Sequence, residues 1–95
     1  MRTERGAGDI PRLTLYARDG CHLCEDMAAS LAELFEPGSF GVERVDIDAD
    51  PGLRARYDTE VPVLALGERE LCRHFLDPVA VREGLAGYNG RPAPR

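Results

Sequence analysis

The sequence predicts an α/β protein whose four-stranded mixed sheet is flanked by helices, with its elements in the order βαβαββα. Short apolar or alternating runs, typical of strands, are interleaved with segments whose apolar residues recur every three or four positions, typical of helices. Asp-Pro pairs at 50–51 and 77–78 mark two helix starts, because Asp caps a helix well and Pro suits its first position. A Gly-Glu pair at 67–68 predicts a turn between the last two strands.

The first half of the chain supplies a strand, a helix and a second strand. In the strand predicted over 12–16, Leu13 and Leu15 alternate with polar residues. The helix predicted over 22–35 carries an apolar stripe and ends at the Glu-Pro-Gly stretch that follows it. The stripe consists of Leu23, Met27, Leu31 and Leu34. The second strand is predicted over 41–47, and the right-handed crossover rule makes it parallel to the first.

The second half contributes a helix, two strands and a last helix. The helix predicted over 51–57 is followed by a short apolar strand over 62–66, suited to the centre of the sheet. A strand over 70–75 forms an antiparallel hairpin with it, and a final helix runs to about residue 86. One face of the second hairpin strand is expected to carry Leu71, Arg73 and Phe75, and the other face Cys72 and His74.

One domain accounts for the chain of 95 residues. Residues 1–10 and 88–95 have no periodic pattern and are predicted as flexible tails, which leaves 11–87 as the domain. No apolar run approaches the roughly 18 residues that cross a membrane, and the N-terminal residues lack the apolar stretch of a signal peptide. We therefore expect a cytoplasmic monomer with no membrane partner.

The net charge and the cysteine count argue against two broad classes of protein. The charge is −5 at pH 7, whereas nucleic-acid binding needs a basic face, so we expect no nucleic-acid partner. The three cysteines are too few, and odd in number, for a secreted disulfide scaffold. Cysteines of a cytoplasmic protein stay reduced unless they do redox work or bind a metal, so their arrangement is informative.

Two of the cysteines, Cys21 and Cys24, form a C-x-x-C motif directly after the first strand and at the start of the first helix. The first backbone N–H groups of a helix have no helical partner, and together with the helix dipole they favour a thiolate over a thiol. Cys24 lies one helical turn further on, close enough to close a disulfide. The motif therefore predicts an exposed nucleophile, Cys21, and a more buried resolving thiol, Cys24.

The charged neighbours of Cys21 act in both directions. His22 and Arg18 are expected to stabilise its thiolate, whereas Glu25 and Asp26 oppose it. Because the helix terminus adds to the two cationic neighbours, we expect a lowered pKa for the Cys21 thiol.

Metal binding is an alternative use of the cysteines. Four side chains of types that zinc accepts are Cys21, Cys24, Cys72 and His74. Their spacing departs from the usual zinc patterns, and Cys72 is more readily explained as a buried strand residue. The run Asp46, Asp48, Asp50 resembles the start of a calcium loop but lacks the Gly and Glu that complete one, so it is interpreted as a strand end and a helix cap.

The chain resembles the glutaredoxins, and more closely the bacterial glutaredoxin-like proteins with a C-H-L-C active site. Three stretches carry the resemblance: LTLYARDGCHLCEDM at 13–27, VERVDIDADPGLRARYDTEVPVLAL at 42–66, and the hairpin and helix that follow. The resemblance covers essentially all of 12–87 and implies a thioredoxin-like fold. It also implies a thiol–disulfide oxidoreductase that uses the Cys21 and Cys24 dithiol.

The resemblance further assigns residues to substrate binding. It makes the Val61–Pro62 bond cis and places this loop opposite the C-x-x-C motif, where the backbone of Val61 pairs with the substrate chain. Asp77 corresponds to the Asp that contacts glutathione, but the Gly pair found before it in many glutaredoxins is absent. Glutathione therefore stays open as the reductant. No cofactor is implied, and the partner is a disulfide-containing protein or a small-molecule thiol.

The sequence is compatible with three functions. The first is a dithiol oxidoreductase, and the second is a non-enzymatic redox-sensing or binding module on the same fold. The third is a metal or iron–sulfur site that uses Cys21. Turnover of a disulfide substrate discriminates between the first two, and the metal content of the purified protein tests the third.

Overall fold

The computed structural model describes residues 10–88, which form a four-stranded sheet, three α-helices and two short 3₁₀ helices. The strands are β1 (Arg12–Ala17), β2 (Gly41–Asp46), β3 (Val63–Leu66) and β4 (Arg69–Arg73). The helices are α2 (His22–Leu34), α3 (Pro51–Tyr57), α4 (Pro78–Tyr88), η1 (Ile47–Ala49) and η2 (Asp58–Glu60). No helix within these described residues is long and apolar enough to cross a membrane. The predicted tails lie outside them, except that residue 10 is described and α4 extends to residue 88.

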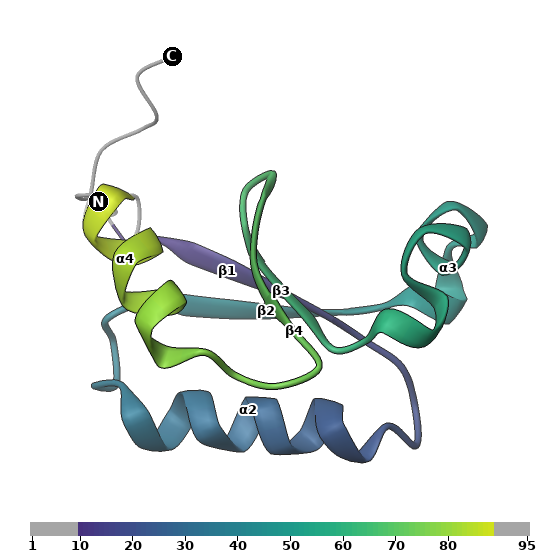
Figure 1. The fold of residues 1–95 in the computed structure, drawn as a ribbon, viewed down its shortest axis with the longest axis horizontal. Helices are drawn as coiled ribbons and strands as arrows, with labels where there is room; N and C mark the ends of the chain where they lie inside the picture. The colour runs from purple at the N-terminus through teal and green to yellow at the C-terminus, as the bar shows by residue number, and fades with distance from the viewer. Residues whose placement is uncertain (1–9, 89–95) are drawn as a thin grey trace, which may run out of the picture.

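The strands form one mixed sheet in the order β2-β1-β3-β4 (Figure 1). β1 is parallel to β2, with Leu13 beside Val42, and antiparallel to β3, with Leu15 opposite Leu64. β3 and β4 form an antiparallel hairpin. The predicted βαβαββα order, the mixed sheet and the direction of each predicted strand pair are therefore confirmed.

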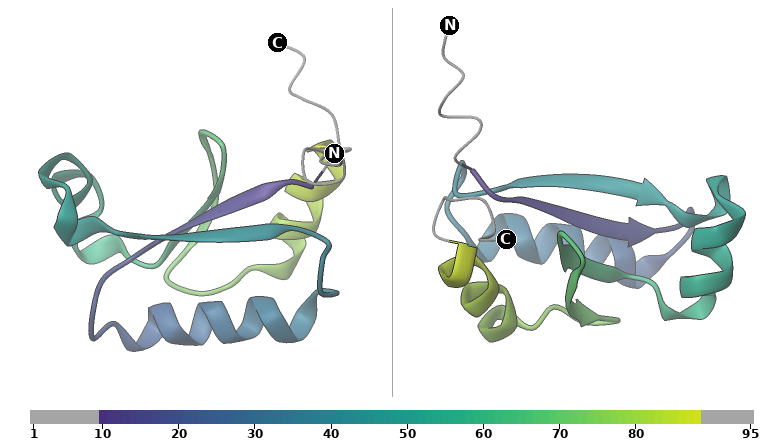
Figure 2. Two further views of the ribbon diagram at one scale, coloured as in Figure 1. Left: turned by 180° about the vertical axis from the view of Figure 1, so that it is seen from behind. Right: turned by 90° about the horizontal axis from the view of Figure 1, so that it is seen from above.

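Helices α2 and α4 pack on one face of the sheet, and α3 lies beyond the carboxyl ends of β1 and β2 (Figures 1 and 2). The main core between the sheet, α2 and α4 consists of Leu13, Leu15, Met27, Leu31, Leu64 and Val81. Because side chains alternate along β1, Leu15 faces this core and Tyr16 faces away from it. The Tyr16 ring stacks on Tyr57 of α3, with the ring centroids 4.6 Å apart.

A second buried cluster lies where β1 ends and α2 begins. It consists of Ala17, Cys24, Ile47, Tyr57, Val61 and Val63. These residues come from β1, α2, η1, α3, β3 and the loop before β3. Their burial removes apolar surface from water and holds the first turn of α2 against that loop.

A bulge in β4 changes which of its side chains face the core. Leu64 pairs with Cys72 whereas Ala65 pairs with Glu70, so Leu71 is an extra residue in this strand. As a result, Leu71 and Cys72 both pack against the main core. The prediction that these two neighbours point to opposite faces is therefore wrong, because it assumed a regular strand.

β4 ends at Arg73, two residues before the predicted end of this strand at residue 75. His74 has a backbone φ of +70°, in the left-handed region, which is incompatible with an extended strand. Phe75, predicted to share a face with Leu71, leaves the sheet, and 69% of its surface is exposed.

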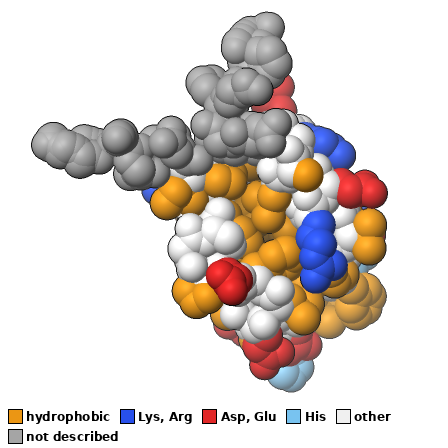
Figure 3. Space-filling view, turned by 90° about the vertical axis from the view of Figure 1, so that its left-hand side faces the viewer, with side chains coloured by type: hydrophobic (Ala, Val, Ile, Leu, Met, Phe, Trp, Pro, Cys, Tyr) orange, Lys and Arg blue, Asp and Glu red, His pale blue; other side chains and the backbone are white. Residues whose placement is uncertain are grey.

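The end of the molecule opposite α3 exposes apolar surface. There Phe35 and Phe40 pack edge to face across the loop that joins α2 to β2, with their ring centroids 5.5 Å apart. Figure 3 faces this end and shows apolar side chains reaching the surface between charged ones. The cysteine motif lies at the other end of α2.

Candidate active site

The chain turns between β1 and α2 and presents Cys21 as the N-cap of the helix. Gly20 has a φ of +77°, which glycine adopts without strain. The backbone of Cys21 is extended, and its Sγ accepts a hydrogen bond of 3.1 Å from the N–H of Cys24. A cysteine sulfur thus takes the place that a Ser or Asp oxygen occupies in other helix caps. At this place the N–H groups and the helix dipole favour a negative charge.

Cys21 and Cys24 form a disulfide, with their Cα atoms 5.2 Å apart. Cys24 is completely buried in the second cluster, whereas Cys21 is half-buried and packs against its edge. The two sulfurs therefore differ in access, and a thiol that approaches from solvent reaches Cys21 more readily than Cys24.

The loop between η2 and β3 lies against the same cluster. Val61 is buried there together with Cys24, and the Val61–Pro62 peptide bond is cis. The Pro62 carbonyl accepts a hydrogen bond of 2.8 Å from the N–H of His74, which ties this loop to the end of β4. Within residues 10–88 the Val61 carbonyl has no hydrogen-bond partner. A free backbone acceptor is therefore present near the disulfide.

Arg18, expected to act on the Cys21 thiolate, is engaged by two aspartates. Its guanidinium donates to the Asp48 carboxylate at 2.7 and 3.3 Å and to the backbone carbonyl of Asp58 at 3.2 Å. The Asp58 carboxylate lies 3.5 Å away. The hydrogen bond from Arg18 lowers the pKa of Asp48 below its ordinary value. Arg18 therefore joins the loop before Cys21 to η1 and η2, and its charge is balanced by these carboxylates.

The first five residues of α2 include three exposed titratable side chains: His22, Glu25 and Asp26. His22 directly follows the nucleophile that the motif predicts. Glu25 forms an ion pair of 2.8 Å with Arg44 of β2, and this hydrogen bond lowers the pKa of Glu25. Asp26 has no ion-pair partner in the part of the chain that the structure describes. The negative charge next to the motif is thus only partly neutralised.

Asp77 caps α4, where its Oδ1 accepts hydrogen bonds of 3.1 and 3.2 Å from the N–H groups of Val79 and Ala80. Asp50 does the same for α3, with 2.8 Å to the N–H of Gly52. Both Asp-Pro pairs therefore begin helices, as their residue types predict. One oxygen of the exposed Asp77 carboxylate is committed to the helix backbone.

The four candidate zinc ligands do not come together. Cys72 packs against the main core, where burial raises the pKa of its thiol, whereas Cys24 lies in the second cluster. The Nε2 atom of His74 lies 3.5 Å from the Glu60 carboxylate. No group of three or more His, Cys, Asp or Glu side chains among residues 10–88 is arranged to hold a metal ion.

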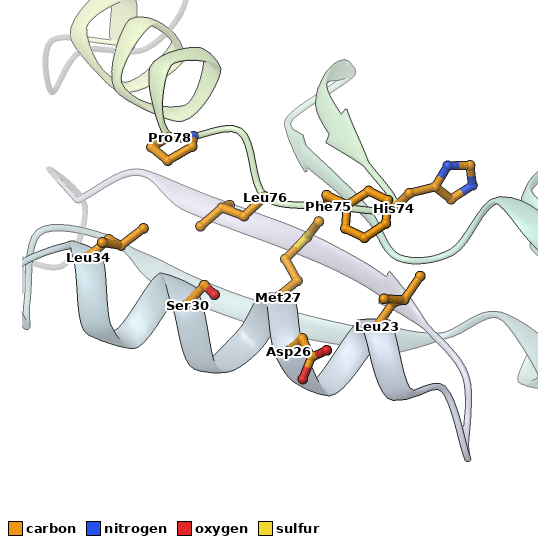
Figure 4. Close-up of a pocket in the computed structure, with 9 residues that line it drawn as sticks. All are labelled: Leu23, Asp26, Met27, Ser30, Leu34, His74, Phe75, Leu76 and Pro78. Carbon is orange, nitrogen blue, oxygen red and sulfur yellow. The ribbon is translucent and has the colours of Figure 1, made fainter.

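Two features near the motif were missed in the sequence. The first is the ion pair of Asp48 with Arg18; the only signal for it in the sequence was the run of alternating aspartates before α3. The second is a groove of about 280 Å³ between α2 and the segment that joins β4 to α4 (Figure 4). Its apolar lining consists of Leu23, Met27, Leu34, Phe75, Leu76 and Pro78. Two residues of the predicted apolar stripe, Leu23 and Leu34, thus line a groove at the surface.

Sequence relatives share most of the length of this chain. A family model described as glutaredoxin-like domain (DUF836) matches residues 12–86. Uncharacterized protein Rv0508 of Mycobacterium tuberculosis is 33% identical over 81 residues, which cover 80% of this chain and 84% of that protein.

Solved structures show the same fold. The solution NMR structure of protein Ne2328 from Nitrosomonas europaea is 38% identical, covers 88% of this chain and 98% of its own, and has a TM-score of 0.71. A mutant thioredoxin from Halobacterium salinarum is 22% identical and covers 92% of this chain and 81% of its own, with a TM-score of 0.54. The second likeness concerns the fold alone. The predicted resemblance is confirmed: this chain belongs to the glutaredoxin-like domain family and has a thioredoxin-like fold.

Proposed function

We propose that this protein is a thiol–disulfide oxidoreductase that exchanges disulfides through Cys21 and Cys24. The observation that carries the proposal is the unequal access of the two sulfurs, half-buried at Cys21 and fully buried at Cys24. Membership of the glutaredoxin-like domain family supports the same chemistry.

In the reducing direction, the Cys21 thiolate attacks one sulfur of a substrate disulfide. The substrate S–S bond breaks, a mixed disulfide forms on Cys21, and the other substrate sulfur leaves as a thiolate that takes up a proton. The Cys24 thiolate then attacks the Cys21 sulfur, which releases the second substrate thiol and forms the Cys21–Cys24 disulfide. Two electrons have passed to the substrate. A reducing thiol, either glutathione or a dithiol protein, regenerates the dithiol by the same exchange.

Three groups of the site support these steps. The N–H of Cys24 and the amino terminus of α2 stabilise a thiolate at Cys21. The exposed imidazole of His22, next to Cys21, is the nearest side chain in sequence that can supply a proton to a leaving thiolate. The free carbonyl of Val61 can accept a hydrogen bond from a substrate backbone N–H, which would align an extended substrate chain beside the disulfide.

A reducing compartment suits this chemistry. Cys72 is a free, half-buried thiol, and free thiols persist in the cytoplasm, where disulfides form mainly as transient catalytic species. We therefore propose a cytoplasmic monomer that cycles between dithiol and disulfide.

Turnover of a disulfide substrate by cysteine variants tests the proposal. With a disulfide-linked peptide dimer and dithiothreitol as reductant, Cys21→Ser should abolish turnover. In a separate reaction without dithiothreitol, the reduced Cys24→Ser variant should accumulate a mixed disulfide on Cys21, visible as added mass that later addition of dithiothreitol removes. Cys72→Ser is the matched control and should retain turnover. A wild-type protein with no turnover, or undiminished turnover by Cys21→Ser, would contradict the proposal.

A further inference from the structure

The groove between α2 and the β4–α4 segment begins at the cysteine motif. Leu23 lines the end of the groove at the amino terminus of α2, and in sequence it lies between the two cysteines (Figure 4). The opposite wall includes His74 and Phe75, and the His74 N–H is bonded to the Pro62 carbonyl. The groove therefore opens between the two segments that flank the disulfide, and it continues along α2 away from it.

The length of this groove suits a short stretch of polypeptide. From Leu23 to Leu34, α2 rises about 16 Å at 1.5 Å per residue, which an extended chain spans with about five residues. The Phe75 ring stands at the edge of the groove with 69% of its surface exposed, and Leu34 at the far end is 49% exposed. Because these apolar side chains are exposed to water, binding of another apolar group that covers them is favourable.

The charges around the motif favour a basic partner over an acidic one. Three arginines on the elements around the motif and its flanking loop already face carboxylates: Arg18 faces Asp48, Arg44 faces Glu25, and Arg73 faces Glu60. Asp26, at the rim of the groove, has no ion-pair partner among residues 10–88. Glutathione carries two carboxylates and one ammonium group. Its carboxylates would find these arginines already paired with protein carboxylates, and they would be repelled by the unpaired carboxylate of Asp26.

We infer that the substrate of this site is a polypeptide disulfide that places an apolar side chain in the groove and a basic side chain next to Asp26. The inference rests on the proposed function, because it names the substrate class of the same dithiol. The apolar residue would lie within about five residues of the substrate cysteine, the span of the groove. Such a peptide is reduced faster than glutathione disulfide.

The test compares disulfide-linked peptide dimers that differ at single positions, with dithiothreitol as reductant. The reference peptide carries Leu three residues from its cysteine and Arg beside that Leu, and its comparison peptides carry Ser or Glu at these places. We expect the wild-type protein to show a kcat/KM about tenfold higher for the reference peptide than for the Ser peptide. Glutathione disulfide should be a poorer substrate than the reference peptide.

Variants of the groove locate the effect. Phe75→Ser should lower kcat/KM for the reference peptide about tenfold more than for glutathione disulfide. Asp26→Asn should reduce the preference for Arg over Glu in the peptide. The matched controls are Val79→Ser, at an exposed apolar residue outside the groove, and Glu33→Gln, on an exposed part of α2. Both controls should behave like the wild type.

Two results separate failure of this inference from failure of the proposed function. Equal kcat/KM for the reference peptide, the Ser peptide and glutathione disulfide would overturn the inference while leaving the dithiol activity in place. So would a Phe75→Ser variant that loses the same factor with every substrate. No turnover of any of these disulfides by the wild-type protein would overturn both.

Discussion

Gly20 is the residue whose backbone prepares the cysteine motif. Its φ of +77° lies in the left-handed region, and a Cβ added to it would have no atom within 4 Å. A substitution there therefore meets backbone strain but no steric clash. This conformation turns the chain so that Cys21 can cap α2. Strain introduced at Gly20 would therefore disfavour the backbone geometry that positions Cys21.

We expect Gly20→Ala to lower the free energy of unfolding by about 1 kcal/mol, because a left-handed backbone costs other residues about 1–2 kcal/mol. Gly20→Asn should lose less, since Asn tolerates this region. The matched control is Gly87→Ala in α4, which has equally open space and no positive φ, and which should be neutral or stabilising. Urea unfolding of the three variants measures these changes. Equal losses from Gly20→Ala and Gly87→Ala would count against the argument.

At the residue scale, the sequence reveals local signals better than distant partners. Cys21 and Cys24 could be assigned to a helix start because the motif, the preceding strand and the apolar stripe are neighbours in sequence. The partner of Arg18 could not be identified from the sequence, because Asp48 lies 30 residues away and only the folded chain brings the two together. A cationic residue close to a cysteine motif in sequence therefore does not by itself predict stabilisation of the thiolate, because its charge can be balanced by a distant carboxylate.

At the scale of elements, Arg18 links the segments that frame the disulfide. A double-mutant cycle of Arg18→Met and Asp48→Asn should give a favourable coupling free energy that shrinks in about 1 M salt, since exposed ion pairs are screened. Arg54 supplies the control, because its Nε lies 3.6 Å from Asp48 and its side chain is 62% exposed. We expect weaker coupling in the cycle of Arg54→Met with Asp48→Asn. Denaturant unfolding at two salt concentrations measures both, and equal couplings would show that Arg18 has no special role.

Helix α4 offers a matched pair of valines that tests how it packs. Val81 is completely buried in the main core, whereas Val79 is 60% exposed. Val81→Ala should lower the free energy of unfolding by about 2 kcal/mol, because it removes buried methyl groups and leaves a cavity. Val79→Ala should stay within about 0.5 kcal/mol of the wild type. Chemical denaturation measures both, and similar losses would mean that α4 packs through another face.

Element types were predictable where their periodic pattern was regular. The parallel pair of strands, the hairpin and both Asp-Pro helix starts follow from spacing and cap chemistry alone. The bulge at Leu71 was not predictable, because an extra residue in a strand has no mark in composition and becomes visible only through pairing with β3. The apolar stripe of α2 correctly predicted a helix, but its outer members, Leu23 and Leu34, line a groove that only the path of the β4–α4 segment creates.

At the scale of the whole molecule, 17 acidic and 12 basic residues leave a net charge of −5. Several of the carboxylates lie in ion pairs: Asp48 with Arg18 and Glu25 with Arg44 join different elements, and Glu70 pairs with Arg73 within β4. The hydrogen bonds from these arginines lower the pKa of each carboxyl. The folded protein therefore holds these groups ionised at a pH where the unfolded chain has begun to bind protons.

The sign of this linkage predicts how stability depends on pH. A carboxyl whose pKa is lower in the folded state contributes stability that is fully present above its unfolded pKa and is lost as the pH falls through its folded pKa. We therefore expect the contribution of these three ion pairs to be constant between about pH 7 and pH 5 and to fall below about pH 4. Denaturant unfolding of the wild type across this range measures the change.

A variant without the paired carboxylates separates this cause from general acid denaturation. The triple variant Asp48→Asn, Glu25→Gln and Glu70→Gln should be less stable than the wild type at pH 7, and the difference should narrow as the pH falls toward 3, because protonation removes the same charges from the wild type. Glu43→Gln removes an exposed carboxylate of β2 that has no ion pair within residues 10–88, and it should track the wild type across the whole range. If the triple variant lost the same stability at pH 3 as at pH 7, the ion pairs would not be the source of the acid sensitivity.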